Sequence, residues 1–164
     1  MFFIRTATDR DLPQVQALLK ETWHATYDAI LGVEQVNALT AKWHDMASLK
    51  RRLATRDAEF VVADDGKQLA GMGYAAMASS EPNLAILHQL YVLPAHQGHG
   101  IGGDLVAELE TCFPNASRMR LEVLSANARA IRFYQSLGFE QTATIENDAG
   151  TGQPAAVFEK DLPG

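Results

Sequence analysis

The sequence predicts one domain of mixed α/β structure, with a central, mostly antiparallel sheet and helices on both of its faces. Two observations lead to this prediction. Segments with strand-like alternation are separated by segments whose apolar residues recur at helical spacing. Their order is a β-meander, then strand–helix–strand–helix and a closing hairpin, which predicts a mixed sheet covered by helices. With 164 residues, 47% of them hydrophobic, and no linker or repeat, the chain is expected to form a single domain over residues 1–164.

The first half of the chain contains a clear helix start and a clear hairpin turn. Asp9 or Asp11 can cap a helix whose apolar positions begin at Leu12. That helix is expected to end near Gly32. Asp65-Gly66 is typical of a hairpin turn between two strands. The other elements expected here are a strand over residues 2–6, short helices over 33–39 and 45–54, and strands over 59–63 and 68–78.

The second half alternates strands and helices around a glycine-rich turn. An apolar strand over residues 84–93 leads into that turn, which opens into an amphipathic helix over 104–110. Gly138 is expected to end a later helix over 127–137, with Phe139 entering the next strand. The remaining expected elements are strands over 119–124 and 155–159, the last preceded by a polar loop over 147–153.

Composition narrows the class of protein. A net charge of −6 argues against a nucleic-acid binder, which would present a basic face to phosphates. No apolar run is long enough to span a bilayer, and residues 1–5 do not resemble a secretory leader. The single cysteine, Cys112, fits a reducing compartment, so a cytoplasmic protein without membrane contact is expected. The five histidines lack metal-ligand spacing, so no metal site is expected.

The glycine-rich turn predicts a binding site for a phosphorylated ligand. Glycines let several backbone N–H groups point into one concave space, next to the positive end of the helix dipole. Gly98-His99-Gly100-Ile101-Gly102-Gly103 also contains GxGxxG, with Glu122 about 20 residues on, so a dinucleotide-binding domain is one alternative. Four residues between strand and turn, and the lack of repeated βαβ units, argue against that alternative.

Two motifs in order point to a known family. Gln97-Gly98-His99-Gly100-Ile101-Gly102 matches Q/R-x-x-G-x-G/A after a Tyr-Val-x-Pro strand end, and residues 127–139 follow the next expected strand. Together they resemble the GCN5-related N-acetyltransferase superfamily, most specifically over residues 84–139. The resemblance implies a splayed sheet and transfer of an acetyl group from acetyl-CoA to an amine.

The resemblance also implies which residues bind acetyl-CoA. Backbone N–H groups of the glycine turn would hold the pyrophosphate, and Leu90 and Val92 would pair with the pantetheine arm like an added strand. Asn127 would hydrogen-bond that arm or serve as an ordinary helix cap. The turn residues with this implied role are Gln97, Gly98, His99, Gly100, Ile101, Gly102 and Gly103, of which His99 either touches phosphate or faces water.

Catalytic roles are implied for Tyr134 and His88. Tyr134 matches a tyrosine that sits beside the thioester sulfur, where a phenol can protonate the leaving thiolate; a packed aromatic is the alternative. Many relatives place a glutamate where this chain has Ile86. His88, two residues on along the same strand face, is the candidate general base, although a hydrogen-bonded buried histidine is equally compatible.

The acceptor end is expected to include the first helix. Trp23 and Tyr27 are predicted to line it, or else to form a core stripe four residues apart. A small-molecule amine is the expected acceptor. The alternatives are a protein or peptide acceptor and a non-catalytic acetyl-CoA sensor, and a homodimer is compatible with the resemblance.

Overall fold

The molecule is built on one seven-stranded sheet with the strand order β1-β2-β3-β4-β5-β7-β6. A computed structural model describes residues 1–163 of the chain. Every neighbouring pair of strands is antiparallel except β4 and β5, which are parallel. The strands are β1 (Phe3–Thr6), β2 (Ala58–Asp64), β3 (Leu69–Met77), β4 (Leu84–Val92), β5 (Arg118–Leu124), β6 (Glu140–Ile145) and β7 (Ala155–Asp161).

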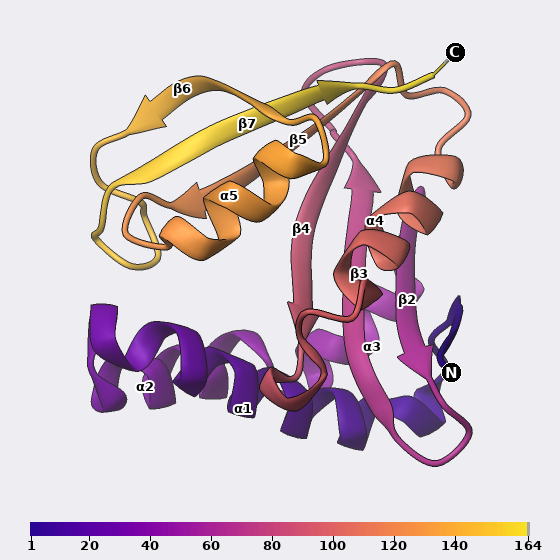
Figure 1. Cartoon of the computed structure of the whole chain (residues 1–164), viewed down its shortest axis with the longest axis vertical. Helices are drawn as coiled ribbons and strands as arrows, with labels where there is room; N and C mark the ends of the chain where they lie inside the picture. Colours follow the sequence, from indigo (N-terminus) through magenta and orange to yellow (C-terminus); the bar gives the residue numbers. More distant parts are fainter. Residues whose placement is uncertain (164) are drawn as a thin grey trace.

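Helices cover both faces of this sheet, which confirms the predicted architecture (Figure 1). On one face α1 and α3 pack against Val62 and Met72; on the other face α4 packs against Val61 and Ala63. Alternation along β2 therefore divides the core in two, as the period of a strand requires. The helices are α1 (Leu12–Leu31), α2 (Val33–Trp43), α3 (Met46–Ala54), α4 (Ile101–Thr111) and α5 (Ala128–Ser136).

Local chemistry explains most helix ends. Gly32, with φ of 88°, ends α1, and the Asp45 side chain accepts a hydrogen bond from the Ser48 N–H at the start of α3. Two boundaries differ from the sequence prediction. Helix α2 runs on to Trp43 rather than ending near residue 39, and α4 begins at Ile101, so that two glycines lie inside its first turn.

Two glycines on β3 allow α4 to approach the sheet closely. A Cβ at Gly71 would lie 3.2 Å from Leu105 Cδ1, and one at Gly73 would lie 2.9 Å from Leu109 Cδ1. Both leucines are completely buried. Helix α4 is therefore held directly against the strands that precede it, which fixes the position of its N-terminus.

Strands β4 and β5 separate after a short junction. They pair only where Leu84–Ile86 lies beside Arg118–Arg120. Beyond that point β4 descends toward α1 while β5 turns away with β7 and β6 (Figure 1). In β4, His88 is an extra residue, because Leu87 is opposite Ala75 and Gln89 is opposite Tyr74. Such bulges bend a strand and re-aim its side chains.

Charged side chains tie the junction together. Arg120 lies 3.1 Å from Glu159 and 3.3 Å from Glu81, and Arg118 contacts both of these carboxylates as well. The network spans β5, β7 and the segment before β4. It lies at the closed end of the separation, so the two strands remain joined there while their other ends diverge.

Candidate active site

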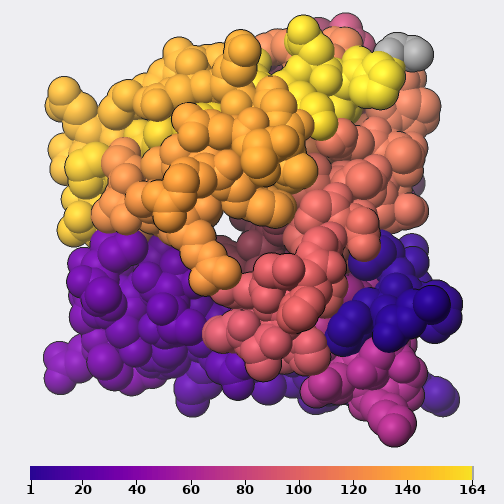
Figure 2. Space-filling view, in the orientation of Figure 1, coloured from indigo at the N-terminus to yellow at the C-terminus, as the bar shows by residue number. Residues whose placement is uncertain are grey.

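A cavity of about 1090 Å³ occupies the space between the separated strands. Its walls come from α1, β4, β5, α5, the segment between β4 and α4, and the loop between β6 and β7. Figure 2 shows the molecular surface hollowed between α5 (orange) and the segment that follows β4 (salmon). Segments far apart in the sequence therefore meet around one space, and most of the residues predicted for the site lie on its walls.

One end of the cavity is formed by unused backbone donors. Gly98 and Gly100 both have φ of 83°, a conformation that favours glycine, and nothing lies within 4 Å of a Cβ built on either one. Helix α4 begins with no side-chain cap. Within residues 1–163, the N–H groups of residues 98–103 donate to no protein acceptor. Free backbone donors at a helix N-terminus are the arrangement that binds phosphate groups in proteins, so this turn is a candidate phosphate site.

Gln97 closes this turn. Its backbone N–H donates to the Pro94 carbonyl at 3.3 Å, and its side-chain Nε2 donates to the Val92 carbonyl at 3.0 Å. Gln97 therefore holds the end of β4 against the turn, while the free donors begin one residue later. Gly102 allows α4 to approach α5 closely, because a Cβ at Gly102 would lie 3.0 Å from the Phe133 ring.

The inner edge of β4 is free of strand partners beyond the junction. The Leu93 N–H donates to Ala70 on β3 at 2.7 Å, so alternation turns the backbone groups of Leu90 and Val92 to the opposite side. That side is the cavity. Leu90 therefore presents an unpaired N–H and C=O to any extended ligand that enters, the arrangement required for strand addition.

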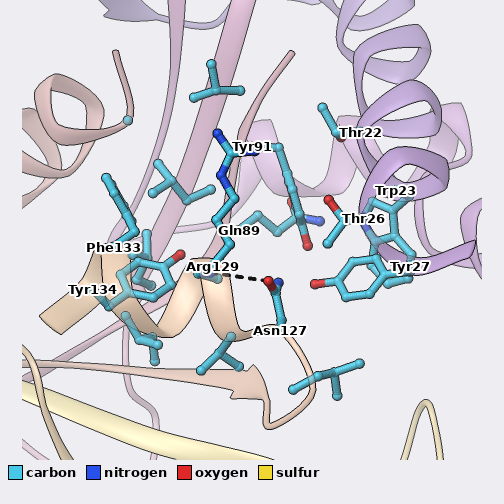
Figure 3. Close-up of a pocket in the computed structure, with 18 of the residues that line it drawn as sticks. Thr22, Trp23, Thr26, Tyr27, Gln89, Tyr91, Asn127, Arg129, Phe133 and Tyr134 are labelled. Carbon is cyan, nitrogen blue, oxygen red and sulfur yellow. Dashed lines mark hydrogen bonds between the residues drawn. The ribbon is translucent and has the colours of Figure 1, made fainter. Parts of the chain in front are cut away.

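Asn127 caps α5 and also faces the cavity. Its Oδ1 accepts a hydrogen bond from the Ala130 N–H at 3.2 Å, which leaves the amide nitrogen free. Figure 3 shows Asn127, Tyr27 and Tyr91 converging at the centre of the cavity. The cap role and a ligand contact are thus compatible, since they use different atoms of one amide.

Three tyrosines surround this centre. Burial raises the pKa of Tyr134, Tyr27 and Tyr91, so all three phenols keep their protons at neutral pH. The Tyr134 ring packs against Phe133 and Phe139 at centroid distances of 5.2 and 5.7 Å. Its hydroxyl is directed into the cavity (Figure 3). Tyr91, which the sequence marks only as part of a strand end, was not predicted as a site residue.

His88 reaches the cavity from the bulge in β4. Part of its surface is exposed, while its ring packs against the cavity wall 5.8 Å from that of Tyr74. Burial by the surrounding walls lowers the pKa of His88, and the charge of Arg52 lowers it further. The imidazole is therefore neutral at pH 7 and has a nitrogen able to accept a proton.

Trp23 and Tyr27 belong both to the core and to the cavity wall. They are 6% and 9% exposed, and their ring centroids are 4.5 Å apart. Trp43 of α2 joins them at 5.9 Å from Trp23, and His44 follows at 5.4 Å. Sequence reasoning found no signal at Trp43 or His44, because only the packing of α2 against α1 and β4 brings them here.

The structure shows neither a cluster of metal ligands nor a membrane-spanning helix in the residues it describes. Among the residues that the structure describes, no three His, Cys, Asp or Glu side chains are placed to hold a metal ion. Over the same 163 residues, no helix has the length and hydropathy needed to cross a membrane.

Comparison with known proteins gives one family. The model of the acetyltransferase (GNAT) family matches residues 15–139. The N-alpha-acetyltransferase RimI of Mycobacterium tuberculosis is 34% identical over 96 residues, 58% of this chain and 60% of that protein. The L-methionine sulfoximine/L-methionine sulfone acetyltransferase of Salmonella typhimurium is 43% identical over 63 residues, 35% of each chain. The chain thus spans less than two thirds of these relatives.

Solved structures show the same fold. The PaiA N-acetyltransferase from Thermoplasma acidophilum, in complex with coenzyme A, superposes with a TM-score of 0.86 at 23% identity, over 98% of this chain and 99% of that one. The ribosomal-protein-S18-alanine N-acetyltransferase from Escherichia coli gives 0.75 at 18% identity, over 100% and 96%.

Proposed function

The chain belongs to the acetyltransferase (GNAT) family, and from this premise we propose that it transfers an acetyl group from acetyl-CoA to the primary amine of a small molecule. One observation supports the proposal above all. Of the six free backbone donors at the start of α4, those of residues 98 and 100–103 belong to residues that line the same cavity as His88 and Tyr134. A phosphate site, a free strand edge, a proton acceptor and a proton donor therefore share one space.

The residues present fit acetyl-CoA. The N–H groups of residues 98–103 would hold the pyrophosphate, and the free edge of β4 at Leu90 and Val92 would pair with the amides of the pantetheine arm. The free amide nitrogen of Asn127 would hydrogen-bond the same arm. Bound there, acetyl-CoA supplies a thioester, whose acetyl carbon is electrophilic and whose sulfur is the leaving group.

The side chains would then divide the proton transfers. An amine attacks only after losing a proton, and neutral His88 accepts it at its unprotonated ring nitrogen, directly or through one water. As the new N–C bond forms and the C–S bond breaks, the Tyr134 hydroxyl gives its proton to the departing sulfur. The newly bonded nitrogen then loses its second proton, which restores the Tyr134 hydroxyl through water, and His88 gives the first proton to solvent. The products are therefore an N-acetylated amine, a free thiol and one proton released to solvent.

The shape of the acceptor end favours a small molecule over a peptide. The loop between β6 and β7 lies against α2, where the Gln35 side chain donates to the Thr151 carbonyl at 3.3 Å. Gly150 packs so closely on the Trp43 ring that a Cβ there would lie 2.2 Å from Cη2. Contact between this loop and α2 restricts the space that an extended peptide needs.

Two measurements test this function. Thermal unfolding with acetyl-CoA, CoA or NAD(P)H identifies the ligand, since only a ligand of the native state raises the melting temperature. We expect acetyl-CoA and CoA to stabilise, and stabilisation by NAD(P)H alone would overturn the assignment. Thiol release with a panel of amines and peptides identifies the acceptor. Faster acetylation of peptides than of free amines would assign a peptide acceptor.

A further inference from the structure

A second, smaller cavity of about 450 Å³ adjoins the first. Trp23, His88 and Tyr91 line both cavities, so the two share a wall at the candidate general base. The smaller cavity adds His44 from the end of α2 and Arg52 from α3. No acidic residue lines it, although the chain as a whole has a net charge of −6.

The unpaired polar atoms of the protein gather here. Within residues 1–163, four buried side-chain nitrogen or oxygen atoms have no hydrogen-bond partner, and each belongs to a residue that lines the smaller cavity. Buried polar groups are nearly always paired, because an unpaired one has lost its hydrogen bonds to water without replacement. The four atoms are Trp23 Nε1, His44 Nε2, Arg52 Nη1 and Gln89 Oε1.

Three of these atoms are donors. Gln89 Nε2 lies 3.4 Å from His44 Nδ1, which assigns the acceptor role to Nδ1 and the proton of the neutral ring to Nε2. Burial lowers the pKa of His44 to about 4, so the ring is neutral at pH 7. The indole of Trp23 and the guanidinium of Arg52 donate only. The cavity therefore presents three N–H donors and one carbonyl oxygen.

Arg52 adds an uncompensated positive charge. Its Nη2 donates to the Trp43 carbonyl at 2.7 Å, which fixes the guanidinium in place. Over the described residues no carboxylate lies within 4.0 Å of this guanidinium, which lines the smaller cavity. Arg52 is half-buried, with its Nη1 atom shielded from solvent, and a charge withdrawn from water without a partner is unfavourable, so the cavity favours an anion that would complete the pair.

We propose that the acceptor is an amino acid or a similar amine that carries a carboxylate close to its amino group, and that the smaller cavity binds this carboxylate. The inference rests on the proposed acetyl transfer. Arg52, His44 and Trp23 would donate to the two carboxylate oxygens. The amino group would then lie at the shared wall, where Gln89 Oε1 can accept one of its hydrogens and His88 another.

Matched acceptors test the charge requirement. Thiol release is measured for each of the twenty amino acids, for its amide and, where one exists, for its decarboxylated amine. We expect the best amino acid to be acetylated with a higher kcat/KM than its amide. Arg52→Met should lower kcat/KM for the amino acid by roughly 30-fold or more and leave that for the amide nearly unchanged, as when one partner of a buried charge pair is removed.

Arg51→Met is the matched control. Arg51 is an exposed neighbour on the same helix that donates to Ser48, outside both cavities. Arg51→Met should leave the preference for the amino acid over its amide intact. Arg52→Lys keeps the charge and is expected to retain part of the preference. Stabilisation of each variant by acetyl-CoA shows that it is folded.

The outcomes separate this inference from acetyl transfer itself. If amines are acetylated but amino acids gain nothing over their amides, or Arg52→Met slows both alike, the carboxylate site is overturned and acetyl transfer stands. If no amine releases thiol, acetyl transfer fails, and tryptophan fluorescence then tests the site, because both tryptophans of the chain line the smaller cavity. A change in fluorescence on adding amino acids, abolished by Arg52→Met, supports the carboxylate site. The absence of any fluorescence change overturns it.

Discussion

At the scale of single residues, the site depends on side chains whose protonation the walls of the cavity control. Burial keeps Tyr134 protonated and keeps His88 and His44 neutral. The same physical cause thus prepares a proton donor, a proton acceptor and a hydrogen-bond donor. Each can be tested by one substitution with a matched control.

Tyr134→Phe is expected to lower kcat by about 100-fold, the lower range for loss of a positioned proton donor. The affinity for acetyl-CoA should change little, since the ring still packs between Phe133 and Phe139. Steady-state kinetics and calorimetric titration with CoA measure the two effects. Unchanged turnover would exclude the proposed role.

His88→Gln should remove the acidic limb of the kcat/KM profile. In the wild-type protein this limb should fall below pH 6.5, because the pKa of His88 is lowered. The comparison is His24→Gln, whose ring bonds to Asp28 and Asn37 away from the cavity. If the variant keeps the wild-type profile, another group is the base.

His44 should make the fold sensitive to acid. Its pKa is about 4 in the native protein against 6.5 for an ordinary histidine. Between these values the unfolded chain binds a proton that the native protein does not, so stability falls as the pH drops from 6.5 to 4, by roughly 3 kcal/mol in all. His88 acts in the same direction.

Urea unfolding at pH 7 and pH 4.5 measures this loss. His44→Gln should reduce the difference in unfolding free energy between the two pH values. An equal loss in the wild-type protein and the variant would assign the acid sensitivity to other groups.

At the scale of elements, the turn before α4 needs glycine both for its backbone conformation and for its proposed contact with acetyl-CoA. Gly100 requires φ of 83°, which costs other residues about 1–2 kcal/mol. Gly100→Ala should therefore lower the melting temperature and also weaken acetyl-CoA binding, because the added methyl enters the space in front of the free N–H groups. Gly66→Ala, with φ of 92° in the β2–β3 turn and equally open surroundings, should lower only the melting temperature. Equal loss of acetyl-CoA affinity in both variants would contradict the proposal that the N–H groups of residues 98–103 bind the pyrophosphate.

The element order was predictable because turns, caps and periodicity are local signals. Asp65-Gly66 and Gly138 lie at the predicted turn and helix end, and the strands fall close to their predicted ranges. The extent of α4 was not predicted, because glycine is a poor helix former and Gly102 lies in the first turn, where it packs against Phe133 of α5, a contact that no local pattern reveals.

At the scale of the whole molecule, the acceptor end is assembled from parts that no local pattern connects. Trp43, His44 and Arg52 have no distinguishing signal in sequence, because their environment depends on how α2 and α3 pack against β4. The glycine turn before α4 could be predicted, since strand, turn and helix are contiguous there; its role in phosphate binding stays a prediction. The smaller cavity could not, and it defines the proposed acceptor class.

Closure of the β6–β7 loop on α2 is a long-range contact that one substitution can disturb. Gly150→Ala places a methyl group against Trp43 and should displace the loop, raising KM for the acceptor several-fold. Acetyl-CoA affinity should stay the same, because the donors of residues 98–103 lie in another segment of the wall. Kinetics with varied acceptor and a CoA titration separate the effects; an unchanged acceptor KM would show that the loop does not shape that end.

The separation of β4 from β5 also bears on which molecules can reach the two free strand edges. Unpaired strand edges invite pairing with foreign chains and start aggregates. Here two such edges face an internal crevice walled by α1 and α5 instead of the outer rim of the sheet. A slender, unbranched molecule can reach them, whereas a neighbouring polypeptide meets the helices first. The fold thus keeps a reactive sheet edge available to a ligand while shielding it from other copies of the chain.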